Sequence, residues 1–260
     1  MGSDIILETH QLTKAFGALV AVSDVSLKVR ANTLHSIIGP NGAGKTTLFN
    51  LLSGNLEPTS GRVIFKGRDI THQPDHRTIH LGIGRSFQIT NIFPNLTAFE
   101  NVRLACQALG KHNFIFWRSV SSFKQYEDRA WEVIQLVGLA PRATMLARTL
   151  PHGDQRKLEL GMILAPDPEL LLLDEPTAGM ASEQVPELLE LIQMIRKTAN
   201  KTVMLVEHNM NVVMNVSDTI TVMHQGQVLA EGNPAEIAAN VEVQNAYLGG
   251  LYHLQSSPGS

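Results

Sequence analysis

The chain has 260 residues, of which 43% are hydrophobic, with a formal net charge of −3 and a mean hydropathy near zero. This composition predicts a globular protein with a sizeable core and argues against disorder. No dense run of Lys or Arg occurs, so nucleic-acid binding is not expected. Cys106 is the single cysteine, which excludes an internal disulfide framework and indicates a reducing, cytosolic compartment.

The hydropathy pattern predicts neither a signal peptide nor a membrane span. The first ten residues, MGSDIILETH, carry two acids and no long apolar core. Nowhere do about 18 apolar residues follow one another. If the protein serves a membrane, we expect it to do so through partners.

The N-terminal part predicts strands around one short helix. VSLKVR (25–30) alternates apolar and polar residues, the period of a half-buried strand. LHSII (34–38) predicts a short apolar strand, and a helix over 46–53 is followed by Gly54, a typical terminator. RVIFKG (62–67) predicts another strand.

The middle of the chain is predicted to be helical. Thr97 and Glu100 have the spacing of a capping box ahead of a helix that runs toward Leu109. A second helix over 126–137 places its apolar residues on one face, and a third begins just after Pro151. Residues 89–165 are therefore predicted to form a helical insertion in an α/β chain.

Alternation of strands and helices resumes afterwards. LLLL (170–173) and TVMLV (202–206) are all-apolar, as parallel strands covered on both faces are. An amphipathic helix over 182–197 separates them, and a hairpin is predicted around Gln225 and Gly226. The tail, 251–260, is predicted to be disordered.

The stretch GPNGAGKTT (39–47) matches the phosphate-binding pattern G-x-x-x-x-G-K-[ST] and lies between a predicted strand and a predicted helix. Its glycines let backbone N–H groups surround phosphate oxygens at the N-terminus of the helix. Lys45 can then reach the β- and γ-phosphates, and the Thr46 hydroxyl can bind Mg²⁺. The stretch predicts ATP and Mg²⁺ as ligands, held by Gly39, Pro40, Asn41, Gly42, Ala43, Gly44, Lys45, Thr46 and Thr47.

An acidic pair, Asp174 and Glu175, follows the strand at 170–173. A carboxylate at the C-terminal end of a strand beside a phosphate loop suits a Mg²⁺ partner, the role predicted for Asp174. Glu175 is then the candidate general base or water-positioning group.

With GPNGAGKTT, LPHGDQR (150–156) and LLLLDEP (170–176) in this order, the chain resembles an ATPase subunit of an ABC transporter over about residues 5–250. The resemblance implies a P-loop NTPase (RecA-like) core with a mainly parallel sheet, an N-terminal antiparallel β subdomain and an inserted helical subdomain. One domain, 5–250, would comprise a core (5–88 and 166–250) and the helical part (about 89–165).

The resemblance also implies roles for single residues. Phe16 in KAFG would stack on adenine, and Gln88 in SFQ would contact Mg²⁺ or water. His208 in LVEH would contact the γ-phosphate. The signature, usually LSGGQ, would be presented to ATP held by the opposite subunit; here it comprises Pro151, His152, Gly153, Asp154 and Gln155.

Two departures from the family pattern concern the contact between subunits. Pro151 stands in place of the signature serine and His152 in place of its first glycine, so a hydroxyl and a backbone N–H are lost. Pro151 also suits the first turn of a helix. Ala181, in AGMA (178–181), stands where the D-loop carries Asp or Asn, which puts signalling through that side chain in doubt.

The segment between Leu109 and Tyr126, the signature, the AGM turn and the ending NAYLG are most like the branched-chain amino acid importers, a family that includes urea, amide and aromatic-acid systems. This resemblance implies a peripheral subunit at the cytoplasmic face of the inner membrane, with permease subunits, a second and usually different ATPase chain, and indirectly a solute-binding protein. Three alternatives stay open: a soluble ABC ATPase, a weakly hydrolysing regulatory cassette, and a P-loop kinase that would leave LPHGDQR without a role.

Overall fold

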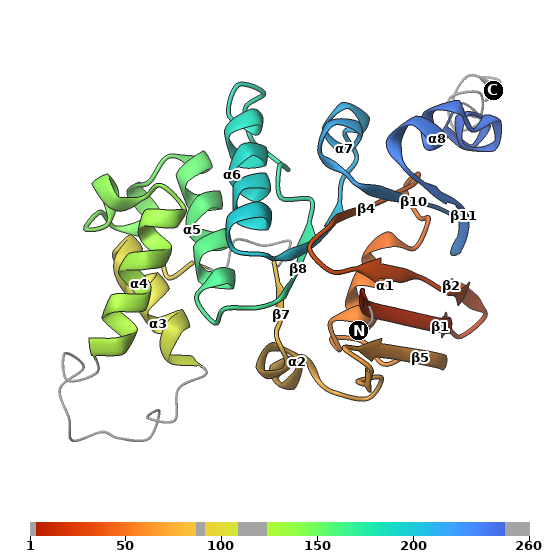
Figure 1. Cartoon of the computed structure of the whole chain (residues 1–260), viewed down its shortest axis with the longest axis horizontal. Coiled ribbons are helices and arrows are strands. Elements are labelled where there is room, and N and C mark those ends of the chain that lie inside the picture. The colour runs from red at the N-terminus through yellow and green to blue at the C-terminus, as the bar shows by residue number, and fades with distance from the viewer. Residues whose placement is uncertain (1–3, 87–91, 109–123, 248–260) are drawn as a thin grey trace, which may run out of the picture. The chain divides into compact units, whose positions relative to one another are not determined.

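The computed structural model describes residues 4–86, 92–108 and 124–247 of the chain. Gln88, the aromatic-rich stretch 112–123 and the tail 251–260 lie outside the described residues. The chain divides into two compact units, residues 1–78 with 202–260 and residues 79–201 (Figure 1). The domain boundaries expected above remain predictions.

The first unit contains an antiparallel sheet in the order β2-β1-β5-β6, with β3 also paired to β1. Its strands are β1 (Ile5–Phe16), β2 (Leu19–Val25), β3 (Lys28–Arg30), β5 (Ser60–Phe65) and β6 (Arg68–Asp69). The alternation predicted over 25–30 is confirmed, because Val25, Leu27 and Val29 are buried. The chain is nevertheless split there into the end of β2 and the short β3.

A second sheet of the same unit has the order β11-β10-β4-β9, in which β10, β4 and β9 are parallel and β11 pairs antiparallel at the edge. These strands are β4 (Leu34–Ile38), β9 (Thr202–Val206), β10 (Thr219–His224) and β11 (Gln227–Gly232). The predicted hairpin is confirmed: Gln225 and Gly226 both have positive φ values, as a tight turn between twisted strands requires.

The helices of this unit include α1 (Lys45–Leu52), α7 (Met210–Val216) and α8 (Pro234–Ala239). α7 and α8 pack on the parallel sheet through one apolar cluster of Ile38, Val213, Ile220, Val222, Ile237 and Val243. Ile38 is the last residue of β4, so this cluster supports the strand from which the phosphate loop departs. The short α2 (Asp75–Leu81) spans the boundary with the second unit.

The second unit pairs two parallel strands, β7 (Ile83–Arg85) and β8 (Leu170–Asp174). Three of its helices, α3 (Ala98–Ala108), α4 (Lys124–Leu136) and α5 (His152–Leu164), pack against one another, as Figure 1 shows. The remaining elements are the short turns η2 (Ala140–Arg142) and η3 (Ala147–Thr149) and helix α6 (Val185–Thr198). α6 begins later than predicted, because residues up to Gln184 form turns.

The capping box predicted at the start of α3 is confirmed. The Glu100 amide donates to the Thr97 hydroxyl at 3.1 Å, and the Thr97 amide donates to the Glu100 carboxylate at 2.8 Å. Both bonds satisfy amides that a helix start leaves without partners, so the sequence pattern alone fixes this helix end.

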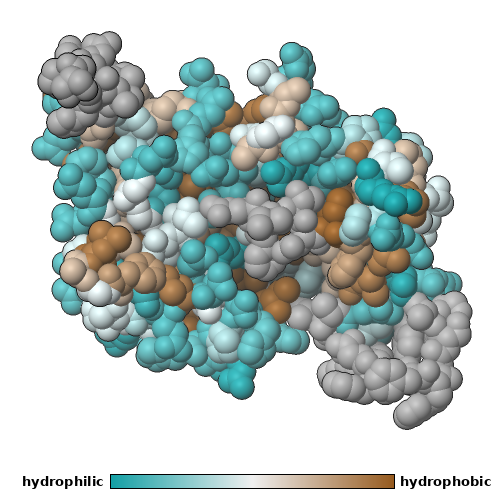
Figure 2. Space-filling view, turned by 180° about the vertical axis from the view of Figure 1, so that it is seen from behind, coloured by the Kyte–Doolittle hydropathy of each residue, from teal (hydrophilic) through white to brown (hydrophobic). Residues whose placement is uncertain are grey.

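On the face seen in Figure 2, hydrophilic residues cover most of the surface and hydrophobic residues form separate small patches. Exposed large hydrophobic side chains include Phe16, Leu19 and Val20 on the β1–β2 hairpin. None of the helices within the described ranges is both long and apolar enough to cross a membrane.

Candidate functional site

The loop between β4 and α1 has a backbone that requires glycine. Gly39, Gly42 and Gly44 have φ values of +152°, +79° and +96°. A Cβ added at Gly39 would lie 2.2 Å from the Met223 carbonyl oxygen, and one at Gly44 would lie 2.3 Å from the Ala21 carbonyl oxygen. The loop is therefore pressed against β10 and β2, and no larger residue fits at these two glycines.

The turn between β10 and β11 is hydrogen-bonded to the phosphate loop. The Gly226 amide donates to the Ala43 carbonyl at 3.1 Å, and the Gly226 carbonyl accepts from the Ser23 amide at 2.8 Å. Gly226 thereby joins the phosphate loop to β2 within the first unit.

The N-terminus of α1 fits a phosphate group. Its N-cap, Gly44, is left-handed and supplies no side-chain cap, so the first amides of this helix and its positive end are directed at the loop. Lys45 Nζ donates to the carbonyl oxygens of Gly39 at 2.7 Å and Pro40 at 3.1 Å. Thr46 is the second residue of the helix, which places its hydroxyl at the same end. Amides, an ammonium and a hydroxyl gathered in this way match the oxygens of a polyphosphate.

Phe16 ends β1 and is half exposed, at 49%. Lys14 Nζ lies 5.3 Å from the centre of its ring, within the range of a cation–π contact. An exposed aromatic face of this kind can stack on a planar base. Phe16 therefore lies at the surface of the first unit and is not a core residue, and its stacking on adenine stays a prediction.

His208 follows β9, the parallel neighbour of β4. Because parallel neighbours end at the same sheet edge, His208 and the phosphate loop lie at one edge of the first unit. Its side chain is exposed, and its backbone amide donates to the Glu207 carboxylate at 3.3 Å. The exposed side chain of His208 therefore lies at the same sheet edge as the phosphate loop.

The acidic pair lies in the second unit. Asp174 is the last residue of β8, is 3% exposed, and its backbone amide donates to the Ser86 hydroxyl at 2.9 Å. Glu175 has a φ of +49°, and its carbonyl accepts from the Ala178 amide at 3.0 Å, so the chain turns sharply there.

The signature forms the start of α5. Pro151 is the N-cap, with φ −54° and ψ 151°, and no side chain caps the helix. The Gln155 amide and side-chain nitrogen donate to the carbonyls of Pro151 and Leu150, both at 3.0 Å. The expectation that Pro151 suits the start of a helix is confirmed, and the first amides of α5 are left without a side-chain cap.

Helix α5 also contacts the turn at 178–181. Arg156 donates to the Ala178 carbonyl at 3.0 Å and to the Glu159 carboxylate at 2.8 Å. The His152 ring lies 3.7 Å from the position that a Cβ of Gly179 would occupy. Signature and turn are therefore neighbours within one chain, a relationship that the sequence spacing did not reveal.

Each unit thus contains part of the site residues that the sequence predicts. The first holds Phe16, the phosphate loop and His208, and the second holds the acidic pair, the signature and the turn at 178–181. Sequence reasoning missed Tyr247, which packs against the apolar cluster containing Ile38 and is hydrogen-bonded with the backbone of Gly39. The signal was present in the ending NAYLG, whose tyrosine had no assigned role.

Comparisons with known proteins agree with these features. A family model described as "ABC transporter" matches residues 22–178, and one described as "Branched-chain amino acid ATP-binding cassette transporter" matches residues 227–253. The "High-affinity branched-chain amino acid transport ATP-binding protein LivG" of Salmonella typhimurium is 40% identical over 252 residues, which cover 95% of this chain and 99% of that protein. BraF of Pseudomonas aeruginosa, of the same description, is also 40% identical, with 94% and 98% covered.

Solved structures show the same fold. The ADP conformation of an ATP-binding cassette of an ABC transporter matches with a TM-score of 0.84 at 29% identity, covering 94% of this chain and 99% of that chain. A dimeric post-hydrolysis cassette bound to ADP and Pi matches with a TM-score of 0.72 at 27% identity, covering 88% and 99%. The fold is that of a P-loop NTPase core with an antiparallel β part and an inserted helical part, as predicted. The chain belongs to the ABC transporter family, as an ATP-binding cassette of its branched-chain amino acid branch.

Proposed function

We propose that this chain is the ATP-binding and ATP-hydrolysing subunit of an ABC importer for branched-chain amino acids or a related small polar solute. The observation that carries the proposal is the phosphate loop, in which left-handed glycines, the uncapped start of α1 and the buried Lys45 converge. The names of the relatives, which are branched-chain amino acid transport proteins, support the solute class.

In this proposal the phosphate loop binds ATP through its backbone amides, and Phe16 stacks on the adenine. Lys45 exchanges its bonds to the carbonyls of Gly39 and Pro40 for the β- and γ-phosphate oxygens. The Thr46 hydroxyl, the Asp174 carboxylate and Gln88 are oxygen donors of the type that Mg²⁺ prefers. When bound, Mg²⁺ neutralises charge on the phosphates during transfer.

The hydrolytic step is assigned to residues at strand ends. Glu175, directly after β8, would orient the attacking water and accept its proton. His208, at the edge shared with the phosphate loop, donates to the γ-phosphate. Lys45 and the loop amides stabilise the charge that develops on the transferring group.

A second cassette completes the nucleotide site. The phosphate loop of that cassette would face the signature of this chain. The uncapped amides at the start of α5 support this role, because a helix N-terminus attracts phosphate oxygens. We propose a heterodimer of cassettes attached to permease subunits at the cytoplasmic face of the inner membrane. A solute-binding protein would act indirectly through the permease.

The test is purification of the complex from membranes through a tag on this chain, followed by assays of phosphate release and of solute uptake in vesicles. We expect a co-purifying permease, a second cassette, and phosphate release that falls by at least about 10²-fold when Glu175→Gln is introduced into this chain and the matching glutamate of its partner. Recovery of the chain without any membrane protein would refute the transporter assignment. Formation of a phosphorylated acceptor instead of free phosphate would indicate a kinase.

A further inference from the structure

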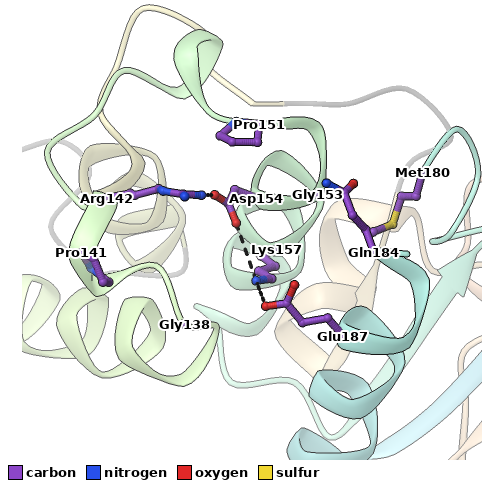
Figure 3. A pocket seen from close by; sticks show the side chains of 10 residues that line it. All are labelled: Gly138, Pro141, Arg142, Pro151, Gly153, Asp154, Lys157, Met180, Gln184 and Glu187. Atoms are coloured by element: carbon purple, nitrogen blue, oxygen red, sulfur yellow. Dashed lines mark hydrogen bonds and ion pairs between the residues drawn. The ribbon is translucent and has the colours of Figure 1, made fainter. Parts of the chain in front are cut away.

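A polar pocket of about 420 Å³ lies beside the signature within the second unit (Figure 3). Residues from the α4–α5 connection, from α5 and from the start of α6 line it, and the argument uses Arg142, Pro151, Asp154, Lys157 and Glu187. The family resemblance assigns no role to Arg142, Lys157 or Glu187.

A continuous chain of ion pairs crosses this pocket. The Asp154 carboxylate pairs with the Arg142 guanidinium on one side and lies 3.6 Å from Lys157 Nζ on the other. Lys157 Nζ in turn lies 2.5 Å from the Glu187 carboxylate on α6. Figure 3 shows the four side chains in this order, with Asp154 between the two cations.

The inner members of this chain are shielded from water. The side chains of Asp154 and Lys157 are 11% and 13% exposed, whereas that of Arg142 is 45% exposed. A shielded carboxylate is costly unless it is paired, and charges at this depth are only weakly screened by salt. The ion pairs therefore hold Asp154, the third residue of α5, from two sides.

That position matters because α5 begins at the signature. A carboxylate here would repel the phosphates of a nucleotide brought to the helix start, since like charges within a few ångströms oppose each other strongly in a partly desolvated site. Arg142 and Lys157 supply two positive charges on opposite sides of Asp154. Because Glu187 pairs with Lys157, the two cations and two carboxylates balance one another beside the start of α5, whose positive end remains.

We propose that Arg142 and Lys157 are positioning residues of the signature, which hold Asp154 in place and offset its charge so that the signature can engage the partner's nucleotide. This inference rests on the proposed function of the signature. Glu187 anchors Lys157 from α6, so three segments of the second unit set the position of the signature.

The experiment measures KM for ATP and kcat of the purified membrane complex carrying Arg142→Ala, Asp154→Asn or both in this chain. Arg142→Ala should raise KM by roughly three- to tenfold, the effect of one uncompensated charge on a triphosphate, with a smaller change in kcat. Asp154→Asn removes the charge that needs compensation, so Arg142→Ala should change KM by less than about twofold in that background. ATP binding by the isolated chain should not change, since the signature acts on the nucleotide of the partner.

Two further variants separate charge from packing. Arg142→Lys keeps the charge and should retain most of the wild-type KM. Arg148→Ala removes an exposed arginine from η3 that lies outside the chain of ion pairs, and should leave KM unchanged.

Equal KM penalties for Arg142→Ala with and without Asp154→Asn would overturn the inference and assign Arg142 a purely structural role. The same conclusion would follow if Arg142→Lys behaved like Arg142→Ala. A wild-type complex that hydrolyses no ATP would refute the proposed function, and the inference with it.

Discussion

Lys45 Nζ lies 2.7 Å from the carbonyl oxygen of Gly39, so the lysine of the phosphate loop is bonded to the first glycine of its own loop. A second bond joins the same ammonium to the Pro40 carbonyl at 3.1 Å. These bonds satisfy a buried cation and hold the loop in a curved shape before nucleotide arrives. In the proposed function, phosphate oxygens would replace these carbonyl oxygens as acceptors.

Alanine substitutions at Gly39 and at Gly42 test the curved shape of the phosphate loop, because both glycines have positive φ values but only Gly39 is in close contact with a neighbouring strand. Gly39→Ala adds a Cβ 2.2 Å from the Met223 carbonyl oxygen, whereas Gly42→Ala meets nothing within 4 Å and suffers only from its φ of +79°. We expect Gly42→Ala to lower the free energy of unfolding by about 1–2 kcal/mol and Gly39→Ala to lower it by roughly 2–5 kcal/mol. Urea unfolding measures both values, and equal losses for the two variants would contradict the close approach of the loop to β10.

Tyr247 connects the C-terminal segment to the phosphate loop. Burial raises the pKa of its hydroxyl to about 12, partly offset by a hydrogen bond with the backbone of Gly39. Tyr247→Phe keeps the ring in the apolar cluster but removes that bond, so we expect a loss of about 0.5–1.5 kcal/mol in stability and a severalfold rise in KM for ATP. Tyr126→Phe, in α4 of the other unit, is the control. An unchanged KM would limit Tyr247 to a packing role.

Pro151→Ser restores two groups that the signature lacks, a hydroxyl and a backbone N–H. A serine at this N-cap accepts from the amides of Gly153 or Asp154 and should stabilise α5 by about 1 kcal/mol. We expect ATP turnover of the assembled complex to rise by roughly two- to tenfold, below the 10²–10³ that one well-aimed donor contributes in the strongest cases. Steady-state phosphate release measures this change, and an unchanged or lower rate would show that the proline does not limit the site.

His35 predicts a pH dependence of stability. Its ring nitrogen Nε2 lies 2.7 Å from the Thr221 hydroxyl inside the parallel sheet, and burial lowers its pKa from 6.5 to about 4. Between these two values the unfolded chain binds a proton that the folded chain does not, so stability falls as pH falls from 6.5 to 4. At neutral pH and above, this contribution is fully present.

The expected loss from His35 is on the order of 3 kcal/mol across that range. His35→Gln retains a hydrogen-bonding side chain but does not titrate, and it should flatten this part of the profile. Urea unfolding of both proteins at several pH values between 4 and 7 gives the difference. Parallel profiles would show that His35 is not the group that titrates.

Much of the local structure was predictable because its causes lie within a few residues. The capping box at Thr97 and Glu100, the hairpin turn at Gln225 and Gly226, and the apolar strand before Asp174 all follow from neighbouring side chains. The chemistry of GPNGAGKTT was equally local, since glycines, a lysine and a threonine between a strand and a helix allow few other uses.

Other relationships depend on residues far apart in the chain. The sequence could not show that Met223 and Ala21 close around Gly39 and Gly44, or that Tyr247 reaches the loop from more than 200 residues away. It also presented Asp154 only as one member of the signature.

The sequence by itself indicated the family, and it predicted which residues bind phosphate and which residue activates water. Only the tertiary structure decided which charges compensate one another, because Asp154 and Lys157 on α5 meet Arg142 and Glu187, which belong to two other segments, only after folding. The physical reason is that local patterns specify hydrogen bonds within a turn of chain, whereas electrostatic balance in a shielded pocket depends on distances that the whole fold sets.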